Sequence, residues 1–356
     1  DVNLDKISKK IYYLNLLQKK FSINKSRKKN IENVKLIIKN CKKYGIIPFA
    51  QAARHGFIAK GLLDSLVSKK VFSQIRSIEL QKVVNTVTSN FLEDINLVKK
   101  KKLTKSSFFR KYGHLRPGAY DITSKNYREM KNIFFEKAFK VKKHKFKLNI
   151  KEQNKLNILL NKEKIDLNHE TLINYIIGSI ELREFSKFIF SKSIDNIFRL
   201  LIKIVPKKLK NKEIVSFFSI NEILNDKASI KLFLKRKNEY ENNIKIFLPE
   251  VINDSKAYDV IPYMFNVPNF ITNNRVIGKV INLSNKLNYS LENKIILIEN
   301  ADPGFDWIFT KKIKGFATQF GGANSHMAIR AAELNIPAVI GCGQKNFDEL
   351  KNSLEI

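Results

Sequence analysis

The hydrophobic pattern of the chain changes near residue 270, and this change limits what the chain can fold into. Upstream, apolar residues recur at the three- and four-residue spacing of amphipathic helices. Downstream, short β-branched or apolar runs alternate with a loop and a helical stretch at 325–334; the runs are 276–283, 294–299 and 337–341. Short strands connected through a helix form β/α units around a parallel sheet.

The sequence therefore predicts an α plus α/β fold, in which a mostly helical domain at residues 1–255 is followed by a small β/α domain at 265–356. Pro249 and residues 258–268 are expected to link the two, because proline interrupts regular structure.

Individual helices are predicted within the first domain. One opens on Ser26, a capping residue, and is expected to end near Gly45. Another is expected at 50–67, with Phe57, Leu62, Leu63 and Leu66 facing inward. Further helices are expected at 75–101, 127–139, 170–191, 194–204 and 226–243.

Length and composition indicate a globular protein of two or three domains. The 356 residues are 44% hydrophobic and 28% charged, which is outside the disordered range. Two cysteines, Cys41 and Cys342, exclude a disulfide framework and a cysteine-rich zinc site. No long apolar run or secretory leader is present, so we expect a cytoplasmic protein with no membrane partner. Because the chain starts at Asp1 and stops at Ile356 next to a possible strand, we expect a piece of a longer protein.

The charge of the chain is strongly positive, with 66 Lys and Arg against 33 Asp and Glu. Such an excess is typical of nucleic-acid binders. However, Lys, Ile and Asn are abundant together, as A/T-rich codons dictate, and residues 301–356 carry no net charge. No aromatic-rich strand accompanies the lysine runs. We therefore expect solvated helix faces and no nucleic-acid partner, with a basic nucleic-acid-binding protein as the alternative from another class.

The segment with the clearest chemical pattern follows residue 320. Gly321 and Gly322 allow a tight turn after a strand, and Asn324 or Ser325 can cap the next helix. His326 then lies in the first helical turn, where free N–H groups and the helix dipole favour negative charge.

Two interpretations of His326 follow from its position. A neutral imidazole there can attack phosphorus and hold the phosphoryl group in a field that favours anions. Arg330, four residues further along the same helix face, can contact that phosphate. The alternative is that His326 is only a capping or core histidine.

A family resemblance bears on this choice. Residues 318–341, TQFGGANSHMAIRAAELNIPAVIG, resemble the phosphohistidine signature of the mobile, swivelling domain of PEP-utilising enzymes. These enzymes include PEP synthase, pyruvate phosphate dikinase and the rifampicin phosphotransferases. The resemblance implies that His326 accepts a phosphoryl group at an ATP-grasp site, with ATP and Mg²⁺, and delivers it to a small-molecule acceptor at a second site.

Other motifs resemble one branch of this family. Residues 299–309 and 110–124 are similar to the branch of L-glutamine kinases and rifampicin phosphotransferase-like enzymes, as are companion motifs at 48–59 and 181–188. That branch combines an ATP-grasp domain, a helical acceptor domain and a phosphohistidine domain. Nothing here resembles the ATP-grasp domain, so the resemblance implies the C-terminal part of a longer enzyme, which alone would not react with ATP. The implied acceptor is L-glutamine, with pyruvate or an antibiotic as alternatives.

The upstream motifs supply candidate acceptor-site residues. Cationic and hydrogen-bonding groups suited to clamping phosphate or carboxylate are Arg54, His55, His114, Arg116 and Arg183. Possible bases are Glu184, Glu181 and Asp121. Alternatively, Arg183 and Glu184 only form an ion pair.

Other residues of chemical interest are expected to be structural. Trp307 is expected to be a packing anchor, Asp302 and Asp306 to cap their turn, and His144 and His169 to be structural or exposed. Cys342 has no expected role. No metal site is predicted.

Overall fold

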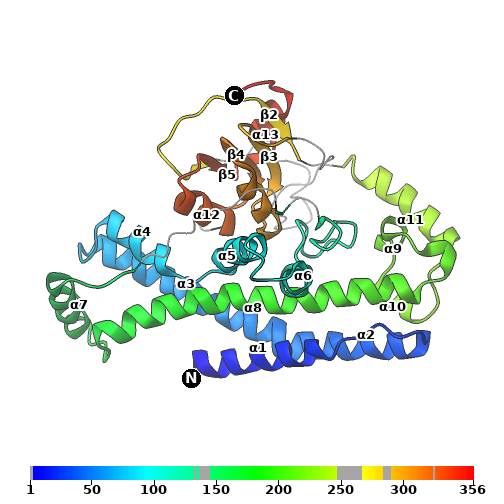
Figure 1. The fold of residues 1–356 in the computed structure, drawn as a ribbon, viewed down its shortest axis with the longest axis horizontal. Helices are drawn as coiled ribbons and strands as arrows, with labels where there is room; N and C mark the ends of the chain where they lie inside the picture. The colour runs from blue at the N-terminus through cyan, green and yellow to red at the C-terminus, as the bar shows by residue number, and fades with distance from the viewer. Residues whose placement is uncertain (1–2, 132–133, 136–144, 247–266, 284–289, 324) are drawn as a thin grey trace, which may run out of the picture. The chain divides into compact units, whose positions relative to one another are not determined.

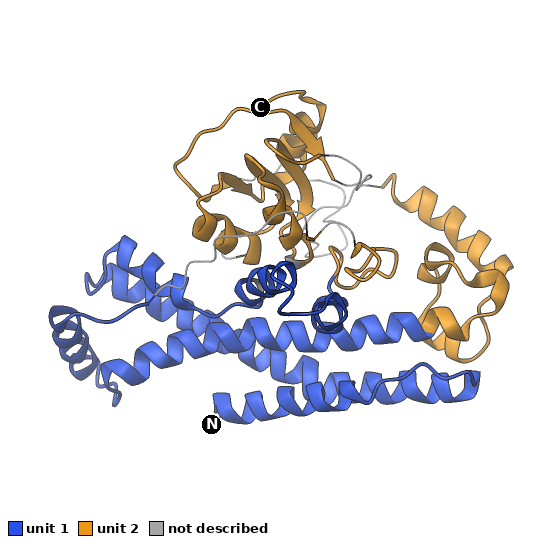
Figure 2. Cartoon of the chain, viewed as in Figure 1, with its two compact units in different colours: residues 1–115, 138–200 blue, residues 116–137, 201–356 orange. Residues whose placement is uncertain are grey.

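The computed structural model describes residues 3–131, 134–135, 145–246, 267–283, 290–323 and 325–356. Contacts divide the chain into two compact units, shown in Figure 2: residues 1–115 with 138–200, and residues 116–137 with 201–356. The predicted domain boundary, between 255 and 265, lies outside the described residues. So does most of the expected linker at 258–268.

The regular elements described in the first unit are helices (Figure 1), and the last of them runs on to residue 204, inside the second unit. The helices are α1 (Leu4–Lys19), α2 (Arg27–Cys41), η1 (Lys42–Ile46), α3 (Ile47–Ser68), α4 (Gln74–Val83), α5 (Val87–Lys99), α6 (Lys105–Tyr112), α7 (Ile150–Lys162) and α8 (His169–Ile204). Apolar clusters join them: Ile11 and Leu14 of α1 pack with Cys41 of α2 and with Ile189 and Phe190 of α8.

The helix predicted from Ser26 is confirmed at its start and wrong at its end. Ser26 accepts a hydrogen bond from the Lys29 N–H and caps α2. Gly45, however, lies inside the π-helical turn η1, through which the chain runs on into α3. A Cβ atom at Gly45 would lie 2.8 Å from Phe190 Cβ and 2.9 Å from a Leu14 methyl carbon. The glycine thus allows close helix packing and does not end the helix.

The inward face predicted for α3 is wrong at Phe57, which is 70% exposed. Leu63 and Leu66 are buried as predicted and Leu62 is half-buried. The rest of the buried face of α3 consists of Pro48, Ala52, Gly56 and Ala59. Small residues lead this face because the Arg183 side chain of α8 passes directly over Gly56, where a Cβ atom would be 3.0 Å from Arg183 Cδ. Phe57 is therefore exposed and Gly56 is buried, the reverse of what their hydrophobicity predicts.

Three other helix predictions need correction. Residues 75–101 form two helices, α4 and α5, because Thr86 caps a new start by accepting from the Ser89 N–H. Residues 170–191 and 194–204 belong to one helix of 36 residues, α8. Of the helix predicted at 127–139, residues 127–130 form turns and 134–135 a bend, only residue 131 is 3₁₀-helical, and 132–133 and 136–139 lie outside the described residues.

Before the sheet, the described part of the second unit contains the 3₁₀ helix η3 (Lys207–Leu209) and the short or exposed helices α9 (Lys212–Ser216), α10 (Ile220–Leu224) and α11 (Ile230–Asn243). Ser229 caps α11 and gives the predicted helix at 226–243 a later start.

The sheet has the strand order β1-β5-β4-β3-β2. Its strands are β1 (Asn269–Phe270), β2 (Val280–Asn282), β3 (Ile295–Asn300), β4 (Gly315–Phe320) and β5 (Ala338–Ile340). β2, β3, β4 and β5 are parallel and β1 is antiparallel. This confirms the predicted α plus α/β class.

Helices α12 (His326–Leu334) and α13 (Gly343–Asn352) belong to the same domain. The first four residues of β3, Ile295–Ile298, are all buried, as expected for a parallel strand covered on both faces. Leu297 and Ala317 pack with Cys342 and Phe347, the latter from α13. The loops after β3 and β4 leave the same edge of this sheet, because the two strands are parallel.

Candidate functional site

The candidate site lies at the edge of the sheet where β3 and β4 end. β3 leads into a 3₁₀-helical segment, η4 (Pro303–Lys311), and β4 leads through a glycine turn into α12. Ligand sites of open parallel sheets lie beyond the carboxyl ends of the strands. The topology thus brings η4 next to the first turn of α12.

The glycine turn after β4 depends on Gly321 and on Gly341 beyond β5. Gly321 has a φ of +132°, and a Cβ atom there would lie 2.8 Å from Ala301 Cβ. Gly341 has a φ of +68°, and its Cβ atom would lie 2.3 Å from the Gly321 carbonyl oxygen. A side chain at Gly322 would enter open space, so of the two expected turn glycines only Gly321 is required by geometry.

α12 begins as the sequence predicts. Ser325 has an extended backbone, and its Oγ accepts a hydrogen bond from the Ala328 N–H at 3.3 Å. His326 is the first residue of the helix, at the end where the helix dipole favours an anion. Asn324, the other expected cap, lies outside the described residues.

His326 is held by a carboxylate from η4. Its Nε2 lies 2.9 Å from both Oδ1 and Oδ2 of Asp306, and each side chain is only 8% exposed. Such a buried carboxylate orients the ring and stabilises positive charge on it. Of the two aspartates expected to cap this turn, Asp302 does so by accepting from the Gly304 N–H at 2.8 Å, whereas Asp306 contacts His326.

Arg330 is buried on the helix that His326 opens, with an exposed fraction of 4%. It forms an ion pair with Glu333 one turn further on. Its Nε has no hydrogen-bond partner among the described residues. A buried guanidinium with an unused donor can still bind an oxygen of an anion.

Residues 116–130 of the same unit pack directly against η4. The fully buried Tyr127 donates its hydroxyl proton to the Gly304 carbonyl oxygen at 3.1 Å. Burial, together with the charges of Asp306 and Asp302, raises the pKa of Tyr127 well above its usual value. A Cβ atom at Gly304 would lie 1.8 Å from the Arg116 carbonyl oxygen, so only glycine allows this approach. The backbone that leads to Asp306 is thereby fixed from outside η4.

Arg116 and Asp121 stabilise their own loop. Arg116 Nη1 donates to the carbonyl oxygens of Asp121 and Ser124, at 3.2 and 3.4 Å. The Asp121 carboxylate accepts from the Thr123 N–H and hydroxyl, at 2.8 and 2.7 Å. These contacts shape the loop that lies on Gly304.

The remaining acceptor-site candidates lie in the first unit. Arg183 contacts Glu184 at 3.0 Å, which is the ion pair of the alternative interpretation. Arg54 is exposed on α3, one residue before His55, whose Nδ1 lies 2.8 Å from the Tyr175 hydroxyl. His114 is buried, with Nε2 3.0 Å from the Phe188 carbonyl oxygen.

Glu181 and the other residues expected to be structural have identifiable contacts. Glu181 accepts from the Asn85 N–H at 2.7 Å, and His169 Nδ1 lies 3.1 Å from Asn157 Oδ1. Trp307 is 2% exposed, as a packing anchor should be. Burial raises the pKa of the Cys342 thiol, which disfavours the reactive thiolate. His144 lies outside the described residues.

Sequence reasoning missed the roles of Asp306 and Tyr127 as contacts of the site. Asp306 is 20 residues from its partner, so no local periodicity indicates the pair. For Tyr127 the separation from its acceptor is 177 residues.

Two other kinds of feature are absent from the described residues. These residues contain no group of three or more His, Cys, Asp or Glu arranged to hold a metal ion. No helix among them has the length and apolar character needed to cross a membrane.

The fold and site together define a small parallel β/α domain that presents a capped histidine helix beside a carboxylate. Residues 291–355 match the family model described as "PEP-utilising enzyme, mobile domain". This part of the chain is therefore a mobile domain of the PEP-utilising enzyme family.

Two curated proteins are similar to the chain over limited regions. Phosphoenolpyruvate synthase of Aquifex aeolicus is 31% identical over 123 residues, which cover 30% of this chain and 14% of that enzyme. Rifampicin phosphotransferase of Bacillus cereus is 29% identical over 136 residues, covering 36% and 16% respectively. The matched region thus spans only a small part of each relative's length.

Proposed function

We propose that the chain belongs to an ATP-dependent phosphotransferase in which His326 carries a phosphoryl group from ATP to a small-molecule acceptor. One observation carries the proposal: within the matched mobile domain, His326 opens a capped helix and lies 2.9 Å from the buried Asp306 carboxylate. A histidine needed only as a cap would not require a buried anionic partner.

The residues around His326 suit each stage of the transfer. An imidazole nitrogen attacks the β-phosphorus of ATP, an N–P bond forms, and the P–O bond to AMP breaks; water releases the γ-phosphate. Asp306 offsets the positive charge that the ring gains as the N–P bond forms. The N-terminus of α12 and Arg330 then stabilise the new anion.

In this proposal ATP and Mg²⁺ bind to an ATP-grasp domain outside these 356 residues. The chain by itself is then not phosphorylated by ATP. The domain division at 255–265 is part of the same proposal, since a carrier domain has to move between its donor and acceptor sites; the contacts of residues 116–130 with η4 then form in only one of these positions.

We further propose that the helical domain holds the acceptor and that the acceptor is L-glutamine. Transfer then breaks the N–P bond at His326 and forms an N–P bond at the glutamine amide, whose proton goes to a base. The cations proposed to neutralise the moving group are Arg54, His114, Arg116 and Arg183, with Glu184 as the base.

The second candidate acceptor is pyruvate, supported by the similarity to an enzyme named phosphoenolpyruvate synthase. An antibiotic acceptor has the same kind of support from the rifampicin phosphotransferase. Each of these acceptors would use the same His326 chemistry.

The first test measures the phosphohistidine. The full-length protein is incubated with β-labelled ATP, and acid-labile label is located by mass spectrometry. We expect label on His326 and none in His326→Ala. His169→Ala is the matched control, because His169 is also the first residue of a helix, α8. Label that persists in His326→Ala would falsify the proposal.

The second test identifies the acceptor. Glutamine, pyruvate and a rifamycin are supplied separately, and AMP release is measured for each. We expect AMP release with glutamine. AMP release with pyruvate and not with glutamine would replace our first candidate by the second.

A further inference from the structure

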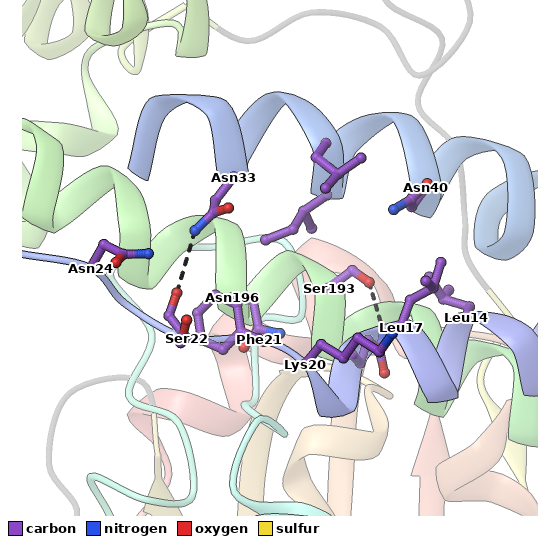
Figure 3. Close-up of a pocket in the computed structure, with 13 residues that line it drawn as sticks. Leu14, Leu17, Lys20, Phe21, Ser22, Asn24, Asn33, Asn40, Ser193 and Asn196 are labelled. Atoms are coloured by element: carbon purple, nitrogen blue, oxygen red, sulfur yellow. Dashed lines mark hydrogen bonds between the residues drawn. The ribbon is translucent and has the colours of Figure 1, made fainter. Parts of the chain in front are cut away.

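A cavity of about 220 Å³ lies within the first unit, lined by residues of α1, α2, α8 and the segment that joins α1 to α2 (Figure 3). None of the site residues discussed above lines it. Its volume is below that of typical pockets for drug-sized ligands, about 300–1,000 Å³, so it suits a smaller molecule.

Gln18 forms a buried polar part of the cavity wall. Its side-chain Nε2 donates to the Ile189 carbonyl oxygen at 2.8 Å and to Ser193 Oγ at 2.7 Å, which fixes the amide orientation. Its Oε1 is buried and accepts no hydrogen bond from the described residues, and Gln18 as a whole is only 8% exposed. Leaving a buried acceptor unsatisfied is costly, so this oxygen calls for a donor from a ligand.

Further amides surround the same space. In Figure 3, Asn33 and Asn40 extend from α2, and Asn196 extends from α8. Asn196 is only 4% exposed. Each side-chain amide offers both a donor and an acceptor, and a ligand amide offers the complementary pair. The lining therefore favours a carboxamide.

Apolar and charged residues restrict the ligand further. Leu14, Leu17 and Phe21 supply an apolar wall for an aliphatic chain. Lys20 is the cation among the described lining residues, and it is exposed. Those lining residues include no Asp or Glu, so a carboxylate is attracted to Lys20 without repulsion from the wall.

We propose that this cavity binds a short aliphatic carboxamide that also carries a carboxylate. The amide N–H₂ donates to Gln18 Oε1, and the carboxylate lies near Lys20. The inference goes beyond the proposed function, since this binding does not require phosphoryl transfer at His326. None of the residues proposed to hold the acceptor lines this cavity, so the cavity is a second binding site, separate from the one that receives the phosphoryl group.

Binding is tested on the full chain with L-glutamine as the probe and L-glutamate as its isosteric counterpart. Calorimetry should show glutamine binding, and glutamate binding weaker by about tenfold or more, because a second carboxylate would face an amide oxygen. His326→Ala should bind glutamine like the unaltered chain, which separates this result from a failure of the proposed function.

Two variants locate the bound molecule. Gln18→Met keeps the side-chain length and removes the acceptor, but it also removes two structural hydrogen bonds. Asn40→Leu alters the half-buried α2 wall of the cavity, and the Asn40 side chain makes no hydrogen bond to the other described residues. Both should weaken glutamine binding by about tenfold or more. Asn242→Leu, the same change at an exposed position of α11, should leave binding unchanged.

The outcomes decide between binding and an empty cavity. Absence of glutamine binding at millimolar concentration, equal binding of glutamate, or unchanged binding in a folded Asn40→Leu variant would overturn the proposal.

Discussion

Asp306 places both carboxylate oxygens 2.9 Å from Nε2 of His326, across 20 residues of sequence and in a site where each side chain is 8% exposed. The two residues meet because β3 and β4 are parallel neighbours, so that η4 and α12 start from the same sheet edge. An ionic contact in such a site is screened far less than one at the surface. Removing the negative charge of Asp306 should therefore measurably weaken the stabilisation of positive charge on the imidazole of His326.

The first prediction concerns this carboxylate. Asp306→Asn keeps the side-chain shape and the possibility of one hydrogen bond, but it removes the negative charge. We expect the rate of His326 phosphorylation to fall by about tenfold or more, because the positive ring is no longer stabilised. The rate of label incorporation measures this effect, and ¹⁵N chemical shifts of His326 report the change in its protonation.

Asp302→Asn is the matched control, since it removes a charge from the same turn. Asparagine can still accept from the Gly304 N–H, so the cap remains. We expect near-normal labelling. Equal losses in the two variants would mean that Asp306 acts only on the fold of η4.

The second prediction concerns the close contact between Gly341 and Gly321. Gly341→Ala should lower the free energy of unfolding of the second unit by about 1–3 kcal/mol, because φ is positive and Cβ would meet the Gly321 carbonyl oxygen. Trp307, the single tryptophan, lies in this unit and reports its unfolding by fluorescence. Gly322→Ala should change the same free energy by about 0.5 kcal/mol or less, since its Cβ enters open space.

Local sequence patterns predicted the parts of this fold that depend on neighbours in the chain. Ser26 and Ser325 cap the helices expected of them, because capping requires only the next few backbone N–H groups. The strands at β3 and β5 follow from short buried runs between loops. His326 and its helix could be placed for the same reason.

Long-range packing explains what the sequence did not predict. Phe57 is exposed and Gly56 buried because the Arg183 side chain occupies the space above Gly56. Gly45 lies within a continuous helical run and not at its end, because α1 and α8 pack so closely against it that no side chain would fit. Asp306 contacts His326 only through the order of strands in the sheet. Each outcome depends on a partner too distant in sequence for periodicity to show.

The third prediction concerns the contact of Tyr127 with η4. Tyr127→Phe removes the hydroxyl that donates to the Gly304 carbonyl oxygen and should lower the stability of the second unit by about 1 kcal/mol. Gly304→Ala should have a larger effect, because its Cβ collides with the Arg116 carbonyl group. Trp307 fluorescence measures both, since Trp307 lies within η4.

Tyr120→Phe provides the comparison for this pair. Tyr120 lies in the same segment and is 64% exposed, so its change should stay within about 0.5 kcal/mol. A Gly304→Ala variant as stable as the unaltered chain would contradict the close approach of residues 116 and 304.

The fourth prediction concerns the pH dependence of the first unit. Arg76 binds Glu152 through two hydrogen bonds of 2.7 and 2.9 Å, and these hydrogen bonds hold the pKa of Glu152 below its usual value. The stabilisation is complete above the unfolded pKa, about 4.3, and is lost as pH falls through the lower folded-state value. Glu152→Gln should cost about 1–2 kcal/mol at pH 7 and much less at pH 3. Hydrogen exchange of α7 amides measures this locally. Glu79→Gln is the control: it alters the more exposed partner of Arg76 and should cost under about 1 kcal/mol. An equal loss of stability at pH 7 and pH 3 in Glu152→Gln would contradict the charge effect.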